Sequence, residues 1–256
     1  MSRVARKNLR ELKESGIVYE INPKQVKSNL RIQQVTPLTE NQKTTFASYN
    51  KDKNILLHGL AGTGKTFISM YLALNEILSK GSPYNKLIIV RSIVPTRDIG
   101  FLPGNTKEKT KVYEGPYYAI CTELFGRGDS YELLKTKGII DFMSTSFIRG
   151  MTLNDSIIIV DEINNMTFHE LDSVITRIGR NCKLLMCGDF RQSDLTKQSE
   201  RQGLSSFMSI LTRMGSFDYV EFSEDDIVRS GLVKEYILAK DKLGYSSGSV
   251  SLRNAA

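Results

Sequence analysis

The feature that most limits the fold of this chain is the glycine-rich run Gly59-Leu60-Ala61-Gly62-Thr63-Gly64-Lys65-Thr66. It fits G-x-x-x-x-G-K-[ST], and it lies where that pattern has meaning, directly after an apolar run and at the start of a helix-period segment. Glycines let the backbone N–H groups of such a loop point at a phosphate, together with the positive end of the helix. The alternative is an ordinary glycine-rich turn, but a chance match in a chain of this composition is on the order of a percent. We therefore predict a phosphate-binding loop.

Two side chains of this loop are expected to contact a bound nucleotide directly. Lys65 is placed to reach the β- and γ-phosphate oxygens, and the hydroxyl of Thr66 is placed to bind Mg²⁺. All eight residues from Gly59 to Thr66 are predicted to bind the nucleotide, which we expect to be ATP.

Short apolar runs alternate with helix-period segments along the chain. The runs are almost unbroken, as strands buried on both faces should be, and the alternation predicts a mainly parallel sheet covered by helices on both faces. Residues 65–78 are apolar nearly all round and predict a central helix, whereas Phe168 to Ile178 carry one apolar stripe that predicts a helix ended by Gly179. The predicted strands are Asn54 to His58, Lys86 to Arg91, Gly138 to Met143, Ser156 to Val160, Lys183 to Cys187 and Asp218 to Phe222.

The length of 256 residues fits one large α/β domain with additions at its ends. We expect a basic arm over 1–35, a core over 36–244 and a disordered polar tail over 245–256. Residues 1–31 hold eight Lys or Arg and three Glu, so they carry five of the net +7 charges. This segment can draw nucleic acid by neutralising phosphates, or it can act only as a solvated tail that aids solubility.

The sequence gives no sign of a membrane or secretory protein. No apolar stretch approaches the roughly 18 residues that span a bilayer, and the N-terminus lacks the apolar centre of a signal peptide. We expect a cytoplasmic protein without a membrane partner. The three cysteines lack a CxxC pair and are interpreted as plain thiols: Cys121, Cys182 and Cys187.

Two acids end the apolar run that begins at Ser156. Asp161 and Glu162 should therefore lie at the carboxyl edge of the sheet, beside the phosphate loop. Asp161 is expected to hold the metal with Thr66, and Glu162 to act as the general base on water. Such a strand end is a weak signal alone, but it becomes a strong one when it follows Lys65 by 96 residues.

Two glutamines are further candidates. Gln192 follows the run Lys183 to Cys187, where it can touch both the attacking water and the γ-phosphate; the alternative is that Gly188 and Asp189 simply form a turn. Gln42 lies at the start of a helix before the loop, and its amide offers the donor and acceptor that match the adenine edge. An exposed Gln at a helix start is the alternative for Gln42.

Several further segments, taken in order, resemble the PhoH-like family of P-loop ATPases, which are relatives of superfamily 1 helicase cores. The similarity covers about Thr36 to Ala239. It implies a single RecA-like core, ATP binding and hydrolysis, and a link to RNA that is poorly defined. Besides Gly59 to Thr66, it rests on RSIVPTRDIGFLPG (Arg91 to Gly104), FIRGMT (Phe147 to Thr152), IVDEINN (Ile159 to Asn165), TRIG (Thr176 to Gly179), GDFRQSDL (Gly188 to Leu195) and DIVRSGLV (Asp226 to Val233).

The chain departs from the family pattern in places. Asn164 stands where the family usually has Gln, which puts the positioning of water or nucleic acid in doubt. The family's Glu-Lys and Pro-Tyr stretch is looser, at Glu108-Lys109 and Pro116-Tyr117. There is no room for the N-terminal nuclease-like domain of some relatives, so the chain resembles the short, stand-alone form.

Three arginines lie in the family-like segments: Arg149, Arg177 and Arg229. Each is either a structural ion-pair partner or an arginine that stabilises charge on the transferred phosphoryl group, often from a neighbouring subunit. We expect Arg229 to project from a helix capped by Ser223 and to serve a neighbouring subunit. Arg91 is expected to face substrate or nucleic acid.

The leading hypothesis is a Mg²⁺-dependent ATP hydrolase that works as a homo-oligomeric ring and remodels RNA or single-stranded DNA. The alternative is a slow nucleotide-dependent switch that changes partners with its nucleotide state. A small-molecule kinase is disfavoured because Glu162 follows Asp161, as in enzymes that activate water.

Overall fold

The computed structural model describes residues 30–93, 106–190, 195 and 197–243. The chain divides into two units, 1–30 and 31–256, and the second is described below. Its six strands form one sheet in the order β3-β2-β4-β5-β1-β6, and every neighbouring pair is parallel. The prediction of a parallel α/β fold is confirmed. The strands are β1 (Asn54–Gly59), β2 (Lys86–Arg91), β3 (Ile140–Ser144), β4 (Ser156–Asp161), β5 (Cys182–Gly188) and β6 (Phe217–Phe222).

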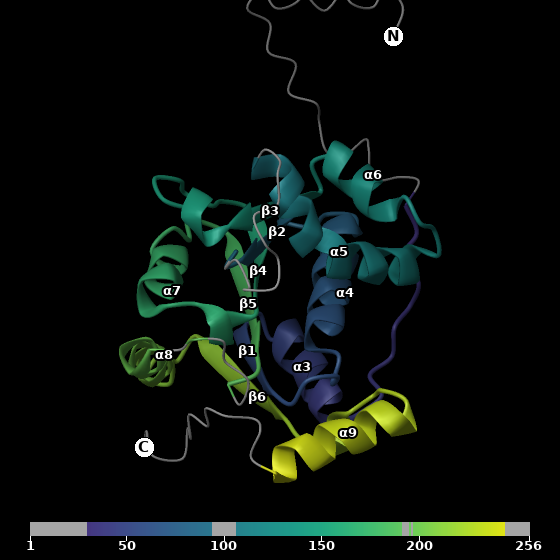
Figure 1. The fold of residues 1–256 in the computed structure, drawn as a ribbon. Coiled ribbons are helices and arrows are strands. Elements are labelled where there is room, and N and C mark those ends of the chain that lie inside the picture. The colour runs from purple at the N-terminus through teal and green to yellow at the C-terminus, as the bar shows by residue number, and fades with distance from the viewer. Residues whose placement is uncertain (1–29, 94–105, 191–194, 196, 244–256) are drawn as a thin grey trace, which may run out of the picture. The chain divides into compact units, whose positions relative to one another are not determined.

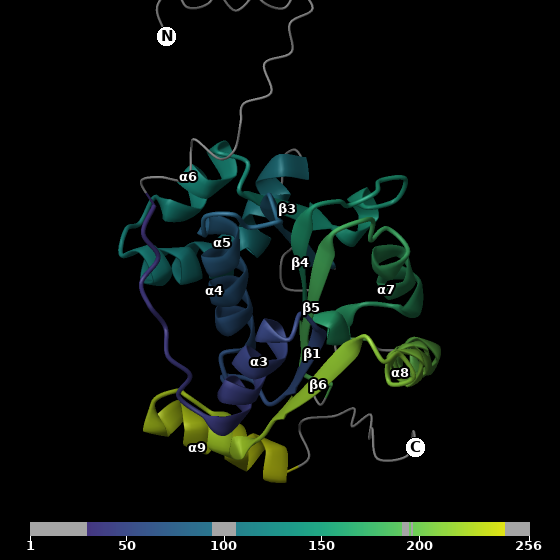
Figure 2. The same ribbon diagram turned by 180° about the vertical axis from the view of Figure 1, so that it is seen from behind.

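Helices cover both faces of this sheet. On one face lie α3 (Glu40–Asn50), α4 (Lys65–Leu78), α5 (Thr106–Phe125) and α6 (Ser130–Thr136); on the other lie α7 (Phe168–Ile175) and α8 (Gln198–Leu211) (Figures 1 and 2). The last helix, α9 (Gly231–Lys242), lies beyond β6 near α3. As predicted, the helix that follows the glycine-rich loop is central, and it spans Lys65–Leu78.

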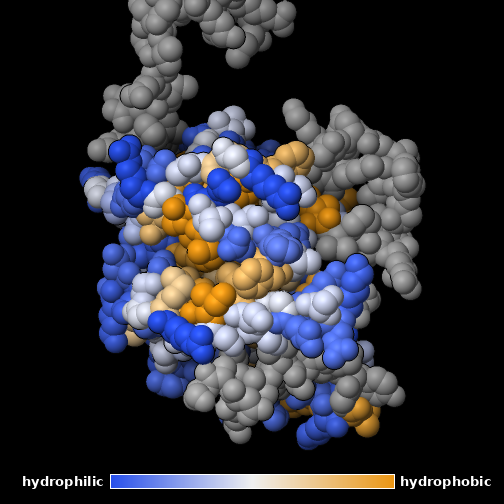
Figure 3. All heavy atoms as spheres, turned by 90° about the vertical axis from the view of Figure 1, so that its left-hand side faces the viewer, coloured by the Kyte–Doolittle hydropathy of each residue, from blue (hydrophilic) through white to orange (hydrophobic). Residues whose placement is uncertain are grey.

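The strands are buried because successive side chains alternate between the two helix layers. One set packs with α7 and α8 into a continuous core, which includes Leu56, Val90, Ile158, Met186, Leu171, Val174, Leu204, Phe207 and Leu211. On the outer surface of this side, apolar atoms lie between charged groups (Figure 3). Within the described part of the chain, no helix combines the length and the apolar character needed to span a bilayer.

The helix predicted over Phe168 to Ile178 is shorter than expected, because α7 ends at Ile175. Its start is fixed by a capping box in which Thr167 and Glu170 satisfy each other's backbone N–H groups. At its end, Arg177 O accepts from Leu153 N at 2.8 Å, and Gly179 N donates to Leu153 O at 2.7 Å. This pairing with an extended segment competes with the helix and ends it three residues early.

The structure also corrects the surroundings of Arg229. The segment capped by Ser223 is only a short 3-10 turn, η4 (Glu224–Asp226), and α9 does not begin until Gly231. Between them, Val228 N donates to Gly62 O at 3.1 Å, which ties the chain to the phosphate loop. The expectation that Arg229 projects from a helix is therefore wrong.

Candidate phosphate and metal site

Strand order brings the predicted site together. β5 pairs with β1 on one side and with β4 on the other, so the ends of all three strands meet at one edge of the sheet. The phosphate loop follows β1, and the two acids come at and after the end of β4. An open cavity of about 850 Å³ lies at this edge and is lined by both.

The glycines of the loop are required by its shape. Gly59 has φ +121°, and a Cβ there would lie 2.0 Å from Phe222 O of the neighbouring strand. Gly62 has φ +76°, and a Cβ there would lie 2.9 Å from Cγ of Arg229. Only a residue without a side chain fits both positions, so the loop can wrap tightly before α4 begins at Lys65.

Lys65 folds back over this loop. Its Nζ donates to Gly59 O at 2.9 Å, to Leu60 O at 2.7 Å and to Thr63 Oγ1 at 3.3 Å. All three partners are neutral, and no described carboxylate lies within ion-pair distance of this ammonium. Burial lowers the pKa of Lys65, while Asp189 and other nearby groups oppose that effect. A phosphate oxygen would give this buried cation the negative partner that it lacks.

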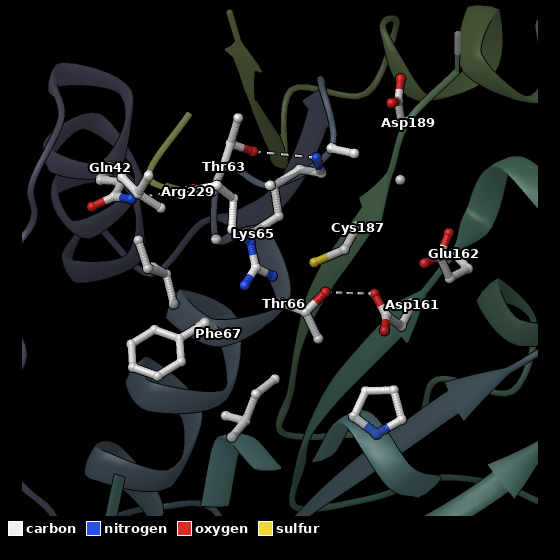
Figure 4. A pocket seen from close by; sticks show the side chains of 18 of the residues that line it. Gln42, Thr63, Lys65, Thr66, Phe67, Asp161, Glu162, Cys187, Asp189 and Arg229 are labelled. Carbon is white, nitrogen blue, oxygen red and sulfur yellow. Dashed lines mark hydrogen bonds between the residues drawn. The ribbon is translucent and has the colours of Figure 1, made fainter. Parts of the chain in front are cut away.

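Thr66 and Asp161 face each other across the gap between α4 and β4 (Figure 4). The Thr66 hydroxyl donates to Asp161 Oδ1 at 2.9 Å, and the carboxylate is only 5% exposed. A hydroxyl and a carboxylate oxygen at one point are the hard oxygen ligands that Mg²⁺ takes beside nucleotide phosphates. The residues at this point therefore fit the expected metal.

Glu162 stands next to that point in an unusual backbone conformation. Its φ of 56° and ψ of 44° lie in the left-handed region, which non-glycine residues adopt mainly where the surroundings demand it, often at functional sites. Burial and the neighbouring Asp161 raise the pKa of the Glu162 carboxyl above its usual value. A carboxylate with a raised pKa is a better proton acceptor, as a general base requires.

The two glutamine candidates differ in what the structure says of them. Gln42 lines the cavity and is buried; its Nε2 donates to Thr63 O at 3.2 Å and its Oε1 accepts from Leu38 N at 2.7 Å. One amide hydrogen and one lone pair remain for a base edge. Gln192 lies outside the described residues.

Asp189 is a cavity residue that the sequence reasoning treated only as part of a turn. It is buried, and its backbone N–H donates to Asn164 Oδ1 at 3.0 Å. A Cβ on Gly188 would lie 2.9 Å from the same oxygen. Asn164, the residue that departs from the family pattern, thus fixes the point where the chain leaves β5 toward Gln192.

The three arginine candidates separate in space. Arg229 lines the cavity and lies against the phosphate loop of its own chain. Arg177 follows α7, close to where β5 begins, which is the opposite edge of the sheet; its Nε is buried without a hydrogen-bond partner among the described residues. Arg149 is exposed. Only Arg229 of the three lies at the predicted site.

Two further residues at the cavity were not predicted in their observed roles. Arg91 ends β2 and lines the cavity, where it shares a hydrogen bond with Tyr117 of α5. Tyr117 in turn donates to Asp161 Oδ2 at 2.9 Å. The sequence signal for Tyr117 was the Pro-Tyr pair, but nothing in the sequence places a helix residue against Asp161.

Comparison with known proteins agrees with the resemblance of the motifs. A family model described as PhoH-like protein matches residues 34–241. A PhoH-like protein of Bacillus subtilis is 32% identical over 241 residues, which cover 94% of this chain and 73% of that protein. A PhoH-like protein of Mycobacterium leprae is 32% identical over 204 residues, which cover 79% of this chain but only 57% of that protein.

A likeness to solved structures is more distant. The crystal structure of Pif1 helicase from Candida albicans matches 82% of this chain and 44% of that chain, with a TM-score of 0.39 and 15% sequence identity.

Proposed function

Because the chain belongs to the PhoH-like family, we propose that it binds ATP with Mg²⁺ and hydrolyses the γ-phosphate. The observation that carries this proposal is the meeting of Thr66 with Asp161, at 2.9 Å, directly beside Glu162 and Lys65. One hydroxyl, two acids and one buried cation at the mouth of a phosphate loop are the parts that this reaction needs.

Each residue has a definite part in the proposed reaction. The loop N–H groups and Lys65 hold the β- and γ-phosphates, and Gly59 to Thr66 form the wall against which they lie. Mg²⁺, held by Thr66 and Asp161, would neutralise charge on the phosphates. Glu162 accepts a proton from water as the water oxygen bonds to the γ-phosphorus and the bond to the β–γ bridging oxygen breaks, which yields ADP and phosphate. Gln192 is proposed to orient this water.

The base end of the nucleotide is proposed to lie beside Gln42. Leu38 and Val228 give this end of the cavity an apolar lining on which an adenine ring can pack, and the remaining donor and acceptor of the Gln42 amide suit its edge. Arg229, which lies on the loop between these groups and Lys65, is proposed to assist the phosphates.

The direct test is release of phosphate from ATP with Mg²⁺ and with an excess of chelator, compared with GTP, CTP and UTP. We expect turnover that needs the metal and prefers ATP. Turnover that persists in chelator would contradict the roles of Thr66 and Asp161, and equal use of all four nucleotides would contradict the role of Gln42.

Coupling to RNA or single-stranded DNA in an oligomeric ring is the finer proposal. It is supported by the excess of basic residues in 1–31 and by the single core, since a motor with one core needs a neighbouring subunit to complete its cleft. The alternative is a slow switch whose turnover does not respond to nucleic acid.

Turnover with and without poly-RNA or single-stranded DNA, at two salt concentrations, separates these two. Strong, salt-sensitive stimulation supports the motor, and its absence supports the switch. Removing residues 1–31 should flatten the salt dependence of binding while basal turnover persists; an unchanged slope would assign the arm to solubility. Sizing the protein with and without ATP and RNA tests the ring.

A further inference from the structure

The carboxylate that ends β4 is bound on both of its oxygens by neutral hydroxyl groups from two different helices. Thr66 of α4 donates to Oδ1 of Asp161, and Tyr117 of α5 donates to Oδ2, each at 2.9 Å. Tyr117 is completely buried, and its ring lies 5.7 Å from that of Phe142. A hydroxyl carried into the core on a helix that is otherwise half polar requires an explanation beyond packing.

The direction of the Tyr117 hydrogen bond is fixed by a third residue. Arg91, at the end of β2, shares a hydrogen bond with the same hydroxyl. A guanidinium can only donate, so the Tyr117 oxygen must accept from Arg91, and its single hydrogen is left for Asp161. The chain of bonds therefore has one possible sense, from Arg91 through Tyr117 to Asp161 Oδ2.

We propose that Tyr117 is a positioning residue for the metal site: it holds the Asp161 carboxylate so that Oδ1 stays turned toward Thr66. This inference rests on the proposed function, because it concerns how Asp161 is presented to Mg²⁺. Without the Tyr117 hydroxyl, Asp161 Oδ2 would be buried without this donor and the carboxylate could rotate about its Cβ–Cγ bond. Partners of this kind orient metal ligands, and their loss typically costs about 10–100-fold in metal affinity or activity.

The chain offers a matched control for this proposal. Tyr131 of α6 is also completely buried, and its hydroxyl donates to a buried carboxylate, Glu114 Oε2, at 2.6 Å. That carboxylate also pairs with Lys135 at 2.6 Å. Tyr117→Phe and Tyr131→Phe thus make the same chemical change in equally buried places, and only one of them touches the metal site.

The experiment measures ADP affinity with Mg²⁺ and with chelator, and Mn²⁺ affinity of the ADP complex by electron paramagnetic resonance. For Tyr117→Phe we expect Mn²⁺ affinity to fall about 10–100-fold and the gain in ADP affinity from Mg²⁺ to shrink. ADP affinity in chelator should stay at the wild-type value. Tyr131→Phe should match the wild type in all three measurements.

A Tyr117→Phe variant with wild-type Mn²⁺ affinity would overturn the proposal, and so would one that loses ADP affinity equally in chelator, since that pattern indicates general damage to the fold. Arg91→Met provides a second variant, which removes the donor that orients the hydroxyl, and it should lower Mn²⁺ affinity less than Tyr117→Phe does. If the wild type itself gains nothing from Mg²⁺, the proposed function fails as well. If the wild type gains and Tyr117→Phe equals Tyr131→Phe, this inference alone fails.

Discussion

Buried polar clusters lie at both edges of the sheet, and they differ in how their charges are balanced. At the amino edge, Lys183 of β5 is only 6% exposed and pairs with Asp52 at 2.9 Å and with Glu76 at 3.4 Å. Its ammonium also lies 4.1 Å from the centre of the Tyr49 ring, and the Tyr49 hydroxyl donates to Glu76. Every charge in this cluster has an opposite charge beside it.

At the carboxyl edge, cation and acids do not pair. Lys65 donates to backbone carbonyls and a hydroxyl, while Asp161 accepts from Thr66 and Tyr117. Among the described residues, no ion pair joins Lys65 or Arg229 to a carboxylate. Unpaired buried charge is costly, so a fold keeps it where a ligand supplies the missing partner. The closed cluster indicates a structural role and the open one a binding role.

The largest expected effect comes from removing the cation of the open cluster. Lys65→Ala takes away the ammonium that meets the β- and γ-phosphates, so we expect productive ATP binding to be lost and turnover to fall by more than ~10³-fold. The folded protein should remain, because the lysine has no ion-pair partner among the described carboxylates. Ordinary ATP affinity and turnover in this variant, measured by titration and phosphate release, would refute the phosphate site.

Glu162→Gln should separate binding from chemistry at the same edge. The amide keeps the shape but cannot accept a proton, so turnover should fall ~10²–10⁴-fold while ATP still binds. Because burial and Asp161 disfavour the charged form of Glu162, the variant should also unfold at a higher temperature than the wild type without nucleotide.

The outcome that would reverse these roles is specific. If Glu162→Gln kept its turnover while Asp161→Asn alone abolished it, Asp161 would be the base. A lower unfolding temperature of Glu162→Gln would show that the Glu162 charge is compensated in the folded protein, contrary to the comparison drawn between the two edges.

Lys183→Met tests the closed cluster. It keeps the apolar stem but leaves the paired acids without their cation, so the free energy of unfolding should fall by about 3 kcal/mol, the lower end for a broken buried pair because Asp52 is largely exposed. Turnover of the folded variant should not change. Lys86→Met is the control: its pair with Asp141, at 3.8 Å, is exposed on both sides and should cost less than ~1 kcal/mol.

Denaturant unfolding and phosphate release on the same samples decide this comparison. Equal stability of the Lys183→Met and Lys86→Met variants would remove the structural role of the closed cluster. A loss of turnover in Lys183→Met at temperatures where it is folded would show that the two edges are coupled.

The sequence predicted the sheet and the open cluster well because both are written in short segments. Six apolar runs gave six strands, and the loop with Asp161 and Glu162 needed only the rule that parallel strands end at one edge. The contacts of Tyr117 and Arg91 could not be predicted, because they depend on where a helix 44 residues before Asp161 docks on the sheet.

Arg229 shows the same limit from the other side. Its helix was predicted from a cap and acids that are real, but the cap starts only a 3-10 turn. The bond from Val228 N to Gly62 O then draws the segment onto the loop, and such a long-range contact leaves no local signal.

The smallest expected effect, and the sharpest test of which charges belong to the open cluster, is that of Arg229→Ala. Because a Cβ on Gly62 would lie 2.9 Å from Arg229 Cγ, this side chain lies on the phosphate loop of its own chain. We expect ATP affinity to fall about 10-fold, as for one lost hydrogen bond to a charged group, with a similar loss of turnover. Mixing this variant with Lys65→Ala in confirmed mixed oligomers should restore nothing, since neither chain then has a complete site. Recovery of turnover in the mixture, with ATP affinity intact in the single variant, would instead show that Arg229 serves the phosphate of a neighbouring subunit.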